Sequence, residues 1–217
     1  MLQKSTLEFL RKLKKNNNRE WFAKNKSLYE DAKNDFEVFI FELINDIAEY
    51  DDSVSGLEPK DCIFRIYKDV RFSIDKTPYK KGMGASICKG GRKSSSPGYY
   101  FHIEPGDCFL AGGKYNPPPD QLRAIRMKIL DNTKEFEKII KNKEFVKAFG
   151  KLWDVGNLKT VPRGFPKEHP ASEYLKYKSF LAIHKVEDEK MLSKNMMDYS
   201  LKILKLIKPL DDFMTVI

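Results

Sequence analysis

Long hydrophobic runs are missing from this sequence. No stretch approaches the roughly 18 uninterrupted apolar residues that a membrane-spanning helix needs. The N-terminal stretch MLQKSTLEFLRKLKK carries a charge in every helical turn, so we expect no secretory signal peptide there. The sequence therefore predicts a soluble protein that does not enter a membrane.

Cysteine is scarce as well. The three cysteines, Cys62, Cys88 and Cys108, are far apart, odd in number and outside any C-x-x-C motif. This pattern is typical of reduced thiols in the cytoplasm and not of a disulfide framework. The cysteines and the three histidines show no zinc-ligand spacing either, so we expect no metal site.

Several catalytic fingerprints are also missing. The sequence contains no G-x-S-x-G motif, no G-x-x-x-x-G-K-[ST] motif and no G-x-G-x-x-G motif after a strand. Their absence excludes the usual serine hydrolase, P-loop and dinucleotide-binding patterns. The run Gly90-Gly91-Arg92-Lys93 lies between two expected strands, so it lacks the helix N-terminus of a phosphate cradle. The sequence identifies no cofactor and no oligomeric state.

Aromatic residues are plentiful by contrast. The 217 residues include 15 Phe, 10 Tyr and 2 Trp, although 33% of the residues are charged. Because each aromatic side chain buries about 150–250 Å², these residues can build a sizeable core. We expect residues 1–217 to form a single domain, since no linker or internal repeat divides them.

Positive charge is concentrated in one part of the chain. The formal net charge is +9, and residues 60–93 alone hold ten basic and three acidic side chains, a net charge of +7. A basic surface of this kind attracts anionic ligands and nucleic acids. Scattered lysines on other parts of the surface are typical of solvated positions.

Helical periodicity marks the N-terminal part. The capping-box pattern Ser5-Thr6-Leu7-Glu8 predicts the start of a short helix that ends at Asn16. Asn18 then predicts the N-cap of a second, long helix to about Glu49, in which apolar residues recur at spacings of three, four and seven.

The middle of the sequence changes to short strand-like segments separated by turn residues. The expected strands cover 63–67, 84–89, 99–104, 108–112 and 179–183, with Pro105-Gly106-Asp107 as a hairpin turn. Helices follow from Asp120, and a last helix runs from near Ser193 until Pro209 ends it. The sequence predicts an α+β fold in which a central, mostly antiparallel sheet is flanked by N-terminal and C-terminal helices.

One segment resembles a known family. The run Arg65-Ile-Tyr-Lys-Asp-Val-Arg71-Phe72-Ser-Ile-Asp75-Lys-Thr-Pro-Tyr79 is similar to the signature of a bacterial and fungal family called domain of unknown function 2461. The resemblance extends to the motifs Asn17-Asn-Arg-Glu-Trp-Phe22, Gly98-Tyr-Tyr100, Ile103-Glu-Pro-Gly106, Pro162-Arg-Gly-Phe165 and His169-Pro170. It covers nearly the whole chain and implies membership of this family without implying an activity. The family signature has Arg where this chain has Lys68, which keeps the charge but loses the planar, bidentate donor.

The signature segment also carries the candidate site. We expect Arg65, Lys68, Arg71, Lys76 and Tyr79 to contribute to an anion or phosphate pocket, because guanidinium and ammonium groups bind such ligands. The expected strand directs Arg65 away from its apolar neighbours. An alternative is a network of ion pairs that fixes a long loop, since aspartates alternate with the cations. Acid–base catalysis by one of these aspartates is a third interpretation.

A second irregular segment, 156–178, contributes further candidates. Arg163 and Lys178 are expected to reach the same pocket as ligand-binding residues. The candidate catalytic residues are Asp69, Asp75, Glu104 and His169. A surface loop stiffened by proline, and a glutamate that caps a hairpin, are the structural alternatives for these positions.

Three functions remain open. The first is binding of a small anionic ligand, with or without catalysis. The second is binding of nucleic acid through the basic segment. Nearby aromatic residues for base stacking would be Tyr67, Phe72, Tyr79, Tyr99 and Tyr100. The third function is a structural or protein-interaction module without a ligand, in which the charged cluster only fixes the loop.

Overall fold

The computed structural model describes residues 1–71 and 74–216, which form helices and one four-stranded sheet. The helices are α1 (Lys4–Lys15), α2 (Arg19–Lys24), α3 (Lys26–Ala48), α4 (Pro59–Cys62), α5 (Pro119–Asp131), α6 (Thr133–Ile140), α7 (Lys143–Phe149), α8 (Asp188–Met191), α9 (Met196–Lys205) and α10 (Lys208–Met214). Three short 3-10 helices are η1 (Asp52–Val54), η2 (Gly91–Lys93) and η3 (Tyr174–Lys176). The strands are β1 (Met83–Cys88), β2 (Gly98–Ile103), β3 (Cys108–Lys114) and β4 (Phe180–Val186).

The sheet has the order β1-β2-β3-β4, and each strand pairs antiparallel with its neighbour. The turn between β2 and β3 contains Gly106 at φ 77°, a left-handed conformation that favours glycine. Strand β4 joins the sheet only after α5, α6 and α7. This arrangement confirms the α+β fold that the sequence predicts.

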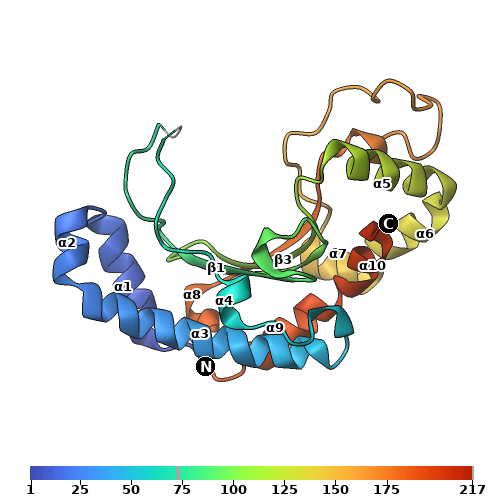
Figure 1. The fold of residues 1–217 in the computed structure, drawn as a ribbon. Helices are drawn as coiled ribbons and strands as arrows, with labels where there is room; N and C mark the ends of the chain where they lie inside the picture. Colours follow the sequence, from blue (N-terminus) through green and yellow to red (C-terminus); the bar gives the residue numbers. More distant parts are fainter. Residues whose placement is uncertain (72–73, 217) are drawn as a thin grey trace.

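One face of the sheet carries the core. Burial alternates along β2, and the ring of Phe101 points toward α3, with its centroid 6.0 Å from that of Phe36 and 4.9 Å from that of Phe39. Figure 1 shows α3 and α9 beneath this face of the sheet. The aromatic residues of β2 and α3 therefore fill the layer between sheet and helices.

The opposite face is open and lies between two raised segments. We call residues 63–71 and 74–81 the arm; it rises from the sheet on the side of α1 and α2 (Figure 1). Residues 156–178 and α5 rise on the other side (Figure 1). The sheet thus forms the floor of a concave surface, which we call the open face.

The N-terminal helices differ in part from the expectation. Asn18 caps α2, since its side chain accepts a hydrogen bond from the Trp21 N–H at 2.9 Å, which confirms the predicted cap. The long helix is interrupted at Asn25, whose backbone leaves the helical region. The first helix begins at Lys4 with Gln3 at its N-cap, so the predicted capping box at Ser5 is wrong.

The C-terminal region, as far as it is described, holds two more helices than predicted, α8 and α10. Pro209 does not end the helical region but lies in the first turn of α10. Proline suits this position because the first N–H groups of a helix have no intrahelical acceptor. Among the described residues, no helix is long and apolar enough to cross a membrane.

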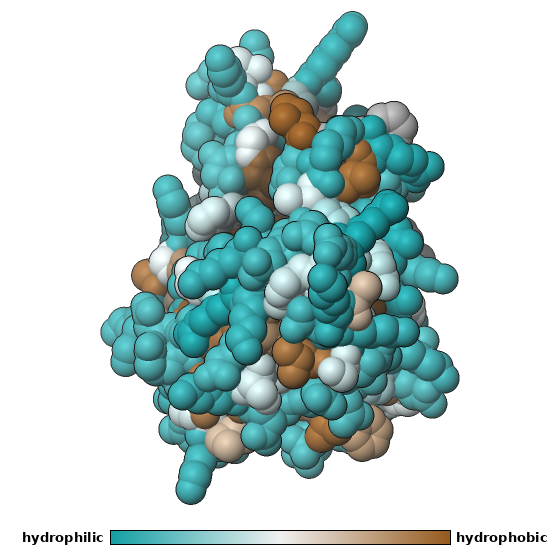
Figure 2. Space-filling model, turned by 90° about the vertical axis from the view of Figure 1, so that its left-hand side faces the viewer, coloured by the Kyte–Doolittle hydropathy of each residue, from teal (hydrophilic) through white to brown (hydrophobic). Residues whose placement is uncertain are grey.

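Figure 2 views the end of the molecule that α1, α2 and the arm form. Hydrophilic residues cover most of this face, and the hydrophobic residues on it lie in small, separate groups. Scattered apolar residues are ordinary on a protein surface. This end of the molecule therefore presents its charged groups to solvent.

Candidate functional site

The arm is held by few backbone contacts. Ile63 bridges Ala85 of β1, and Tyr67 bridges Tyr79 within the arm. Residues 63–67 therefore do not form the regular strand that the sequence predicts, because only isolated bridges pair them. As that strand reading expects, Arg65 and Tyr67 are exposed while Ile66 is buried.

Aromatic packing anchors the base of the arm against the N-terminal helices. The rings of Tyr79 and Phe22 stack with centroids 4.0 Å apart and planes 13° apart. Burial raises the pKa of the Tyr79 hydroxyl. This ring belongs to the core at the base of the arm, although Tyr79 also lines the cavity described below.

Two ion pairs form within the arm. Lys68 Nζ lies 2.7 Å from Asp75 Oδ2, and Arg71 donates two hydrogen bonds to Asp69, at 3.0 Å and 2.8 Å. Hydrogen bonds from Arg71 lower the pKa of Asp69 to about 2, and a hydrogen bond from Lys68 lowers the pKa of Asp75. Both carboxylates are therefore charged at neutral pH, as the ion-pair interpretation of this segment expects.

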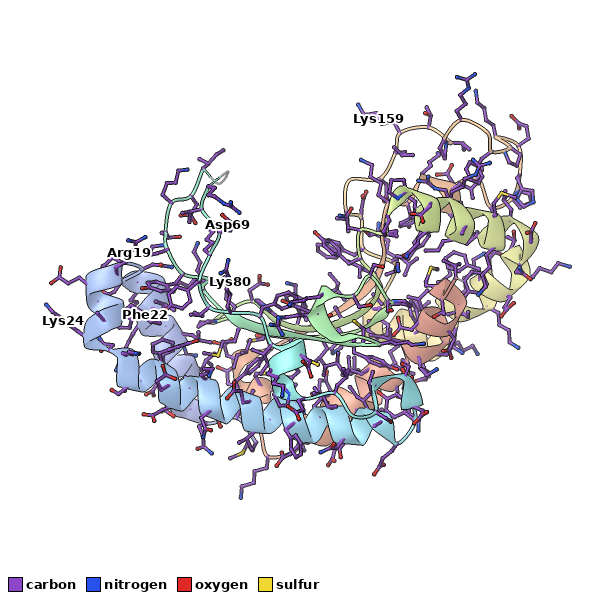
Figure 3. All side chains as sticks on the ribbon, viewed as in Figure 1. Arg19, Phe22, Lys24, Asp69, Lys80 and Lys159 are labelled. Atoms are coloured by element: carbon purple, nitrogen blue, oxygen red, sulfur yellow. The ribbon has the colours of Figure 1, made fainter. Side chains whose placement is uncertain are left out.

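Lys76 is exposed and donates a hydrogen bond to the carbonyl oxygen of Val70 at 3.0 Å. It thus bridges the two sides of the arm far from the sheet. Figure 3 labels Asp69 in this outer part of the arm and Lys80 at its base. The charged groups in the outer half of the arm therefore contact other groups of the arm. The base of the arm contains the cations that form no ion pair.

Two cations at the base of the arm form no ion pair with a described residue, although the charge of Arg65 contributes to the lowered pKa of Asp69. The side chains of Arg65 and Lys80 make neither an ion pair nor a hydrogen bond with any described residue. The Lys80 ammonium lies 5.1 Å from the centroid of the Phe64 ring. Partial burial lowers the pKa of Lys80, and the nearby charge of Arg65 lowers it further.

A cavity of about 310 Å³ lies where the arm meets the open face. We call it the basic cavity, after three lysines in its wall. It is lined by Phe64, Lys68, Asp75, Tyr79, Lys80, Lys81, Gly82, Gly84, Tyr100, His102 and Glu104. The structure thus brings together four of the predicted site residues, namely Lys68, Asp75, Tyr79 and Glu104.

The carboxylate of Glu104 is held from two sides. Lys14 Nζ lies 3.1 Å from Glu104 Oε1, and His102 Nε2 lies 3.7 Å from Oε2. Burial lowers the pKa of His102, while the charge of Glu104 acts in the opposite direction. Tyr100 lies next to His102, with its hydroxyl 3.4 Å from His102 Nδ1.

A glycine makes room for the Tyr100 ring. A Cβ atom at Gly84 would collide with the Tyr100 hydroxyl, so only glycine permits the ring to lie over β1. Burial raises the pKa of Tyr100 to about 12, so its hydroxyl stays protonated at neutral pH. The tyrosine therefore offers the cavity a hydrogen-bond donor.

Lys80 and His102 are cavity residues that the sequence does not single out, and Tyr100 is expected from the sequence only as a residue for base stacking. Lys80 belongs to the basic run, but nothing in the sequence tells it apart from Lys76 or Lys81. The signal for the other two is the alternation along β2, where they lie between buried neighbours.

The candidates in residues 156–178 lie elsewhere. Arg163 and Lys178 are exposed and line neither this cavity nor the arm. His169 Nδ1 accepts a hydrogen bond from the Ala171 N–H at 3.1 Å, which fixes a turn. Their segment rises on the opposite side of the open face, where Figure 3 labels Lys159. The structure therefore does not bring Arg163 together with Arg65 and Arg71.

The aromatic residues considered for base stacking also separate. Tyr79 and Tyr99 are buried, whereas Tyr67 is 50% exposed on the arm. Tyr100 is half-buried on the open face, and Phe72 lies outside the described residues. Among residues 1–71 and 74–216, no group of three or more His, Cys, Asp or Glu side chains is placed to hold a metal ion.

A family model described as a conserved hypothetical protein (DUF2461) matches residues 5–213. No curated protein and no solved structure matches the chain.

Proposed function

The chain belongs to the DUF2461 family of conserved hypothetical proteins, and we propose that it binds a small anionic ligand in the basic cavity. The observation that supports this proposal is the pair formed by Lys80 and Arg65. Two like charges lie close enough for one to lower the pKa of the other, and no described carboxylate forms an ion pair with Lys80. A bound anion would relieve both the repulsion and the cost of partial burial.

The other charges at the cavity have fixed partners. Lys68 is paired with Asp75, and Glu104 is paired with Lys14. Lys81 is exposed at the cavity wall and adds a further cation. The charge that remains for a ligand is therefore positive and is centred on Lys80.

The size of the cavity fits a small ligand. Ligand cavities in proteins have volumes of about 300–1,000 Å³, and the basic cavity, at about 310 Å³, lies at the lower end. This volume accommodates a phosphate or carboxylate group with a short attached fragment. The Tyr100 hydroxyl and the Lys80 ammonium supply donors for such a group.

The proposal is tested by calorimetric titration of the protein with ribose 5-phosphate and with inorganic pyrophosphate. We expect saturable binding that Lys80→Met weakens by at least about tenfold, the size of a lost charge-assisted hydrogen bond. Lys159→Met is the matched control, since Lys159 is exposed on the opposite side of the open face. Absence of binding by the wild-type protein, or an equal loss in both variants, contradicts the proposal.

We also propose a cellular compartment and a domain organisation for the protein. The three cysteines are all buried and form no disulfide, which supports a reducing compartment such as the cytoplasm. Contacts among buried hydrophobic residues run from Leu2 to Met214, which supports one domain over residues 1–217.

A further inference from the structure

A second cavity adjoins the basic cavity on the open face. It has a volume of about 570 Å³ and shares Phe64, Lys80 and Tyr100 with the basic cavity. We call it the aromatic cleft, and its remaining lining includes Arg92, Phe109, Tyr115, Trp153, Leu181 and Ile183. The two cavities therefore form one continuous concave surface with a basic end and an apolar end.

The strand register determines which side chains form the floor of the cleft. Tyr100 of β2 is paired with Ser86 of β1 and with Ala111 of β3, and Ala111 is paired with Ile183 of β4. These four side chains form one row across the open face, because paired residues point to the same side. Ser86 and Ala111, its neighbours across the strands, are small, and Phe109 stacks beside the half-buried Tyr100 ring with centroids 5.7 Å apart.

Two exposed aromatic rings form the walls of the cleft. Trp153 is 51% exposed and Tyr115 is 67% exposed, and neither packs against another aromatic ring among the described residues. The backbone of Trp153 is held in place by its amide N–H, which donates to the Leu181 carbonyl at 2.7 Å. Exposed rings around an apolar floor are the arrangement that binds a flat ligand by stacking.

The rim near Tyr115 is fixed by an unusual backbone. Asn116 has φ 41°, a left-handed conformation that is uncommon outside glycine. Its N–H donates to the Ser179 hydroxyl at 2.9 Å, which ties the rim to the start of β4. The position of Tyr115 is therefore set by the sheet and not by a loose loop.

Positive charge is confined to one edge of the cleft. Lys80 lies at the boundary with the basic cavity, and Arg92, near β1, donates a hydrogen bond to the carbonyl oxygen of Lys60. The opposite wall, with Trp153, Leu181 and Ile183, carries no charge. A ligand that fills both cavities needs an anionic group at one end and a flat apolar part at the other.

We propose that the ligand is an anion carrying a planar aromatic ring, the chemistry of a nucleoside phosphate, whose ring lies in the aromatic cleft and whose anionic group lies at Lys80. This inference rests on the proposed function, because it takes the anion at Lys80 as given. It adds a second point of recognition, formed by Trp153, Tyr115 and Tyr100.

The inference is tested by titrating the protein with AMP, ribose 5-phosphate and adenosine. We expect AMP to bind at least about tenfold more tightly than ribose 5-phosphate, since stacking a base on an aromatic side chain contributes that much or more. Trp153→Ala and Tyr115→Ala are expected to weaken AMP binding by about tenfold each and to leave ribose 5-phosphate binding unchanged. Lys80→Met is expected to weaken the binding of both phosphates.

Fluorescence gives an independent readout of stacking. The sequence has two tryptophans, so the variant Trp21→Phe leaves Trp153 as the single emitter. We expect AMP to quench this emission and ribose 5-phosphate to leave it unchanged. Each variant is compared with the wild type by its melting temperature, so that a folding defect is recognised.

The outcomes separate the two proposals. If ribose 5-phosphate binds but AMP binds no more tightly, the ring site is wrong and the anion site stands. If adenosine binds as tightly as AMP, the anion site is wrong and the ring site stands. If neither AMP nor ribose 5-phosphate binds, both are wrong. A single-stranded oligonucleotide that binds far more tightly than AMP, with a steep dependence on salt, overturns the small-molecule inference in favour of a nucleic-acid strand.

Discussion

The side chain of Asn17 makes two reciprocal hydrogen bonds with the backbone of Tyr79. Asn17 Nδ2 donates to the Tyr79 carbonyl oxygen at 2.9 Å, and Asn17 Oδ1 accepts from the Tyr79 N–H at 3.1 Å. The Asn17 amide thus bonds to the backbone of Tyr79, at the base of the arm, as a neighbouring strand would. The two residues are 62 positions apart in the sequence. This contact joins the α1–α2 connection to the wall of the basic cavity.

The first prediction concerns this contact. Asn17→Ala leaves the part-buried N–H and C=O groups of Tyr79 without their hydrogen-bond partners. We therefore expect a loss of about 1–3 kcal/mol in the free energy of unfolding. Urea denaturation measures it. Asn16→Ala is the control, because the Asn16 side chain makes only an exposed bond to the Lys12 carbonyl oxygen. Equal losses in the two variants would contradict a special role for Asn17.

The second prediction concerns charge at the basic cavity. Asp75→Asn frees the Lys68 ammonium from its partner in the cavity wall, so we expect pyrophosphate to bind about threefold to tenfold more tightly. Asp69→Asn removes an equal charge farther out on the arm, where Arg71 pairs with it outside the cavity. Titration calorimetry on both variants should show the gain for Asp75→Asn alone. A weaker affinity after this change would argue against an anion at Lys68.

The third prediction is a pH dependence. Because partial burial and Arg65 lower the pKa of Lys80, its ammonium loses the proton at a lower pH than an ordinary lysine does. Anion binding needs the charged form, so the affinity for ribose 5-phosphate should fall as the pH rises from 8 toward that of a normal lysine, about 10.4. The phosphate is fully ionised throughout this range. Lys80→Arg should remove the decline, and a flat wild-type profile would count against Lys80 as the binding group.

The fourth prediction concerns a carboxyl group in α10. Asp211 is fully buried, and neither of its carboxylate oxygens has a hydrogen-bond partner among the described residues. Burial raises its pKa well above the ordinary value, and the nearby charge of Asp51 raises it further. The folded state therefore holds a proton that the unfolded state releases near pH 3.9.

It follows that this group's contribution to stability is complete below about pH 3.9 and is lost as the pH rises through the raised pKa. Asp211→Asn should therefore gain in melting temperature relative to the wild type as the pH increases. Asp212→Asn, which affects an exposed neighbour paired with Lys208, should show no such trend. Parallel curves for the wild type and Asp211→Asn would overturn the prediction.

The fifth prediction concerns the thiols. Burial raises the pKa of Cys62 and of Cys108 to about 12, and it also raises the pKa of Cys88. Since the thiolate is the reactive form, native protein should react with Ellman's reagent at least about a hundredfold more slowly than free cysteine. In urea all three thiols should react at once. Rapid reaction of one equivalent of native protein would show that a cysteine is accessible.

Local signals in the sequence predict local structure well here. The Asn18 cap and the Pro105-Gly106-Asp107 turn follow from side-chain and backbone preferences that act within a few residues. The break at Asn25 was missed because apolar spacing continues across it, and helix periodicity does not register a single non-helical residue. Pro209 was misread because proline suits both the end of one helix and the start of the next.

The candidate site was less accessible from the sequence. Aspartates alternate with cations along the arm, and which cation keeps its charge unpaired depends on side-chain directions that the sequence does not encode locally. The distance between Arg163 and the arm depends on how the whole sheet is assembled. The row through Tyr100 depends on strand register, which sets neighbours across four strands.

The late position of β4 in the chain also bears on how the molecule folds. Strands β1 to β3 follow one another closely in the sequence. Ile183 of β4, which pairs with Ala111 of β3, comes only after α5, α6 and α7. Pairings between distant parts of a chain require a large loss of loop entropy and form slowly. The backbone N–H of Trp153 donates to the carbonyl oxygen of Leu181 in this strand. The wall of the aromatic cleft therefore forms in the same slow step.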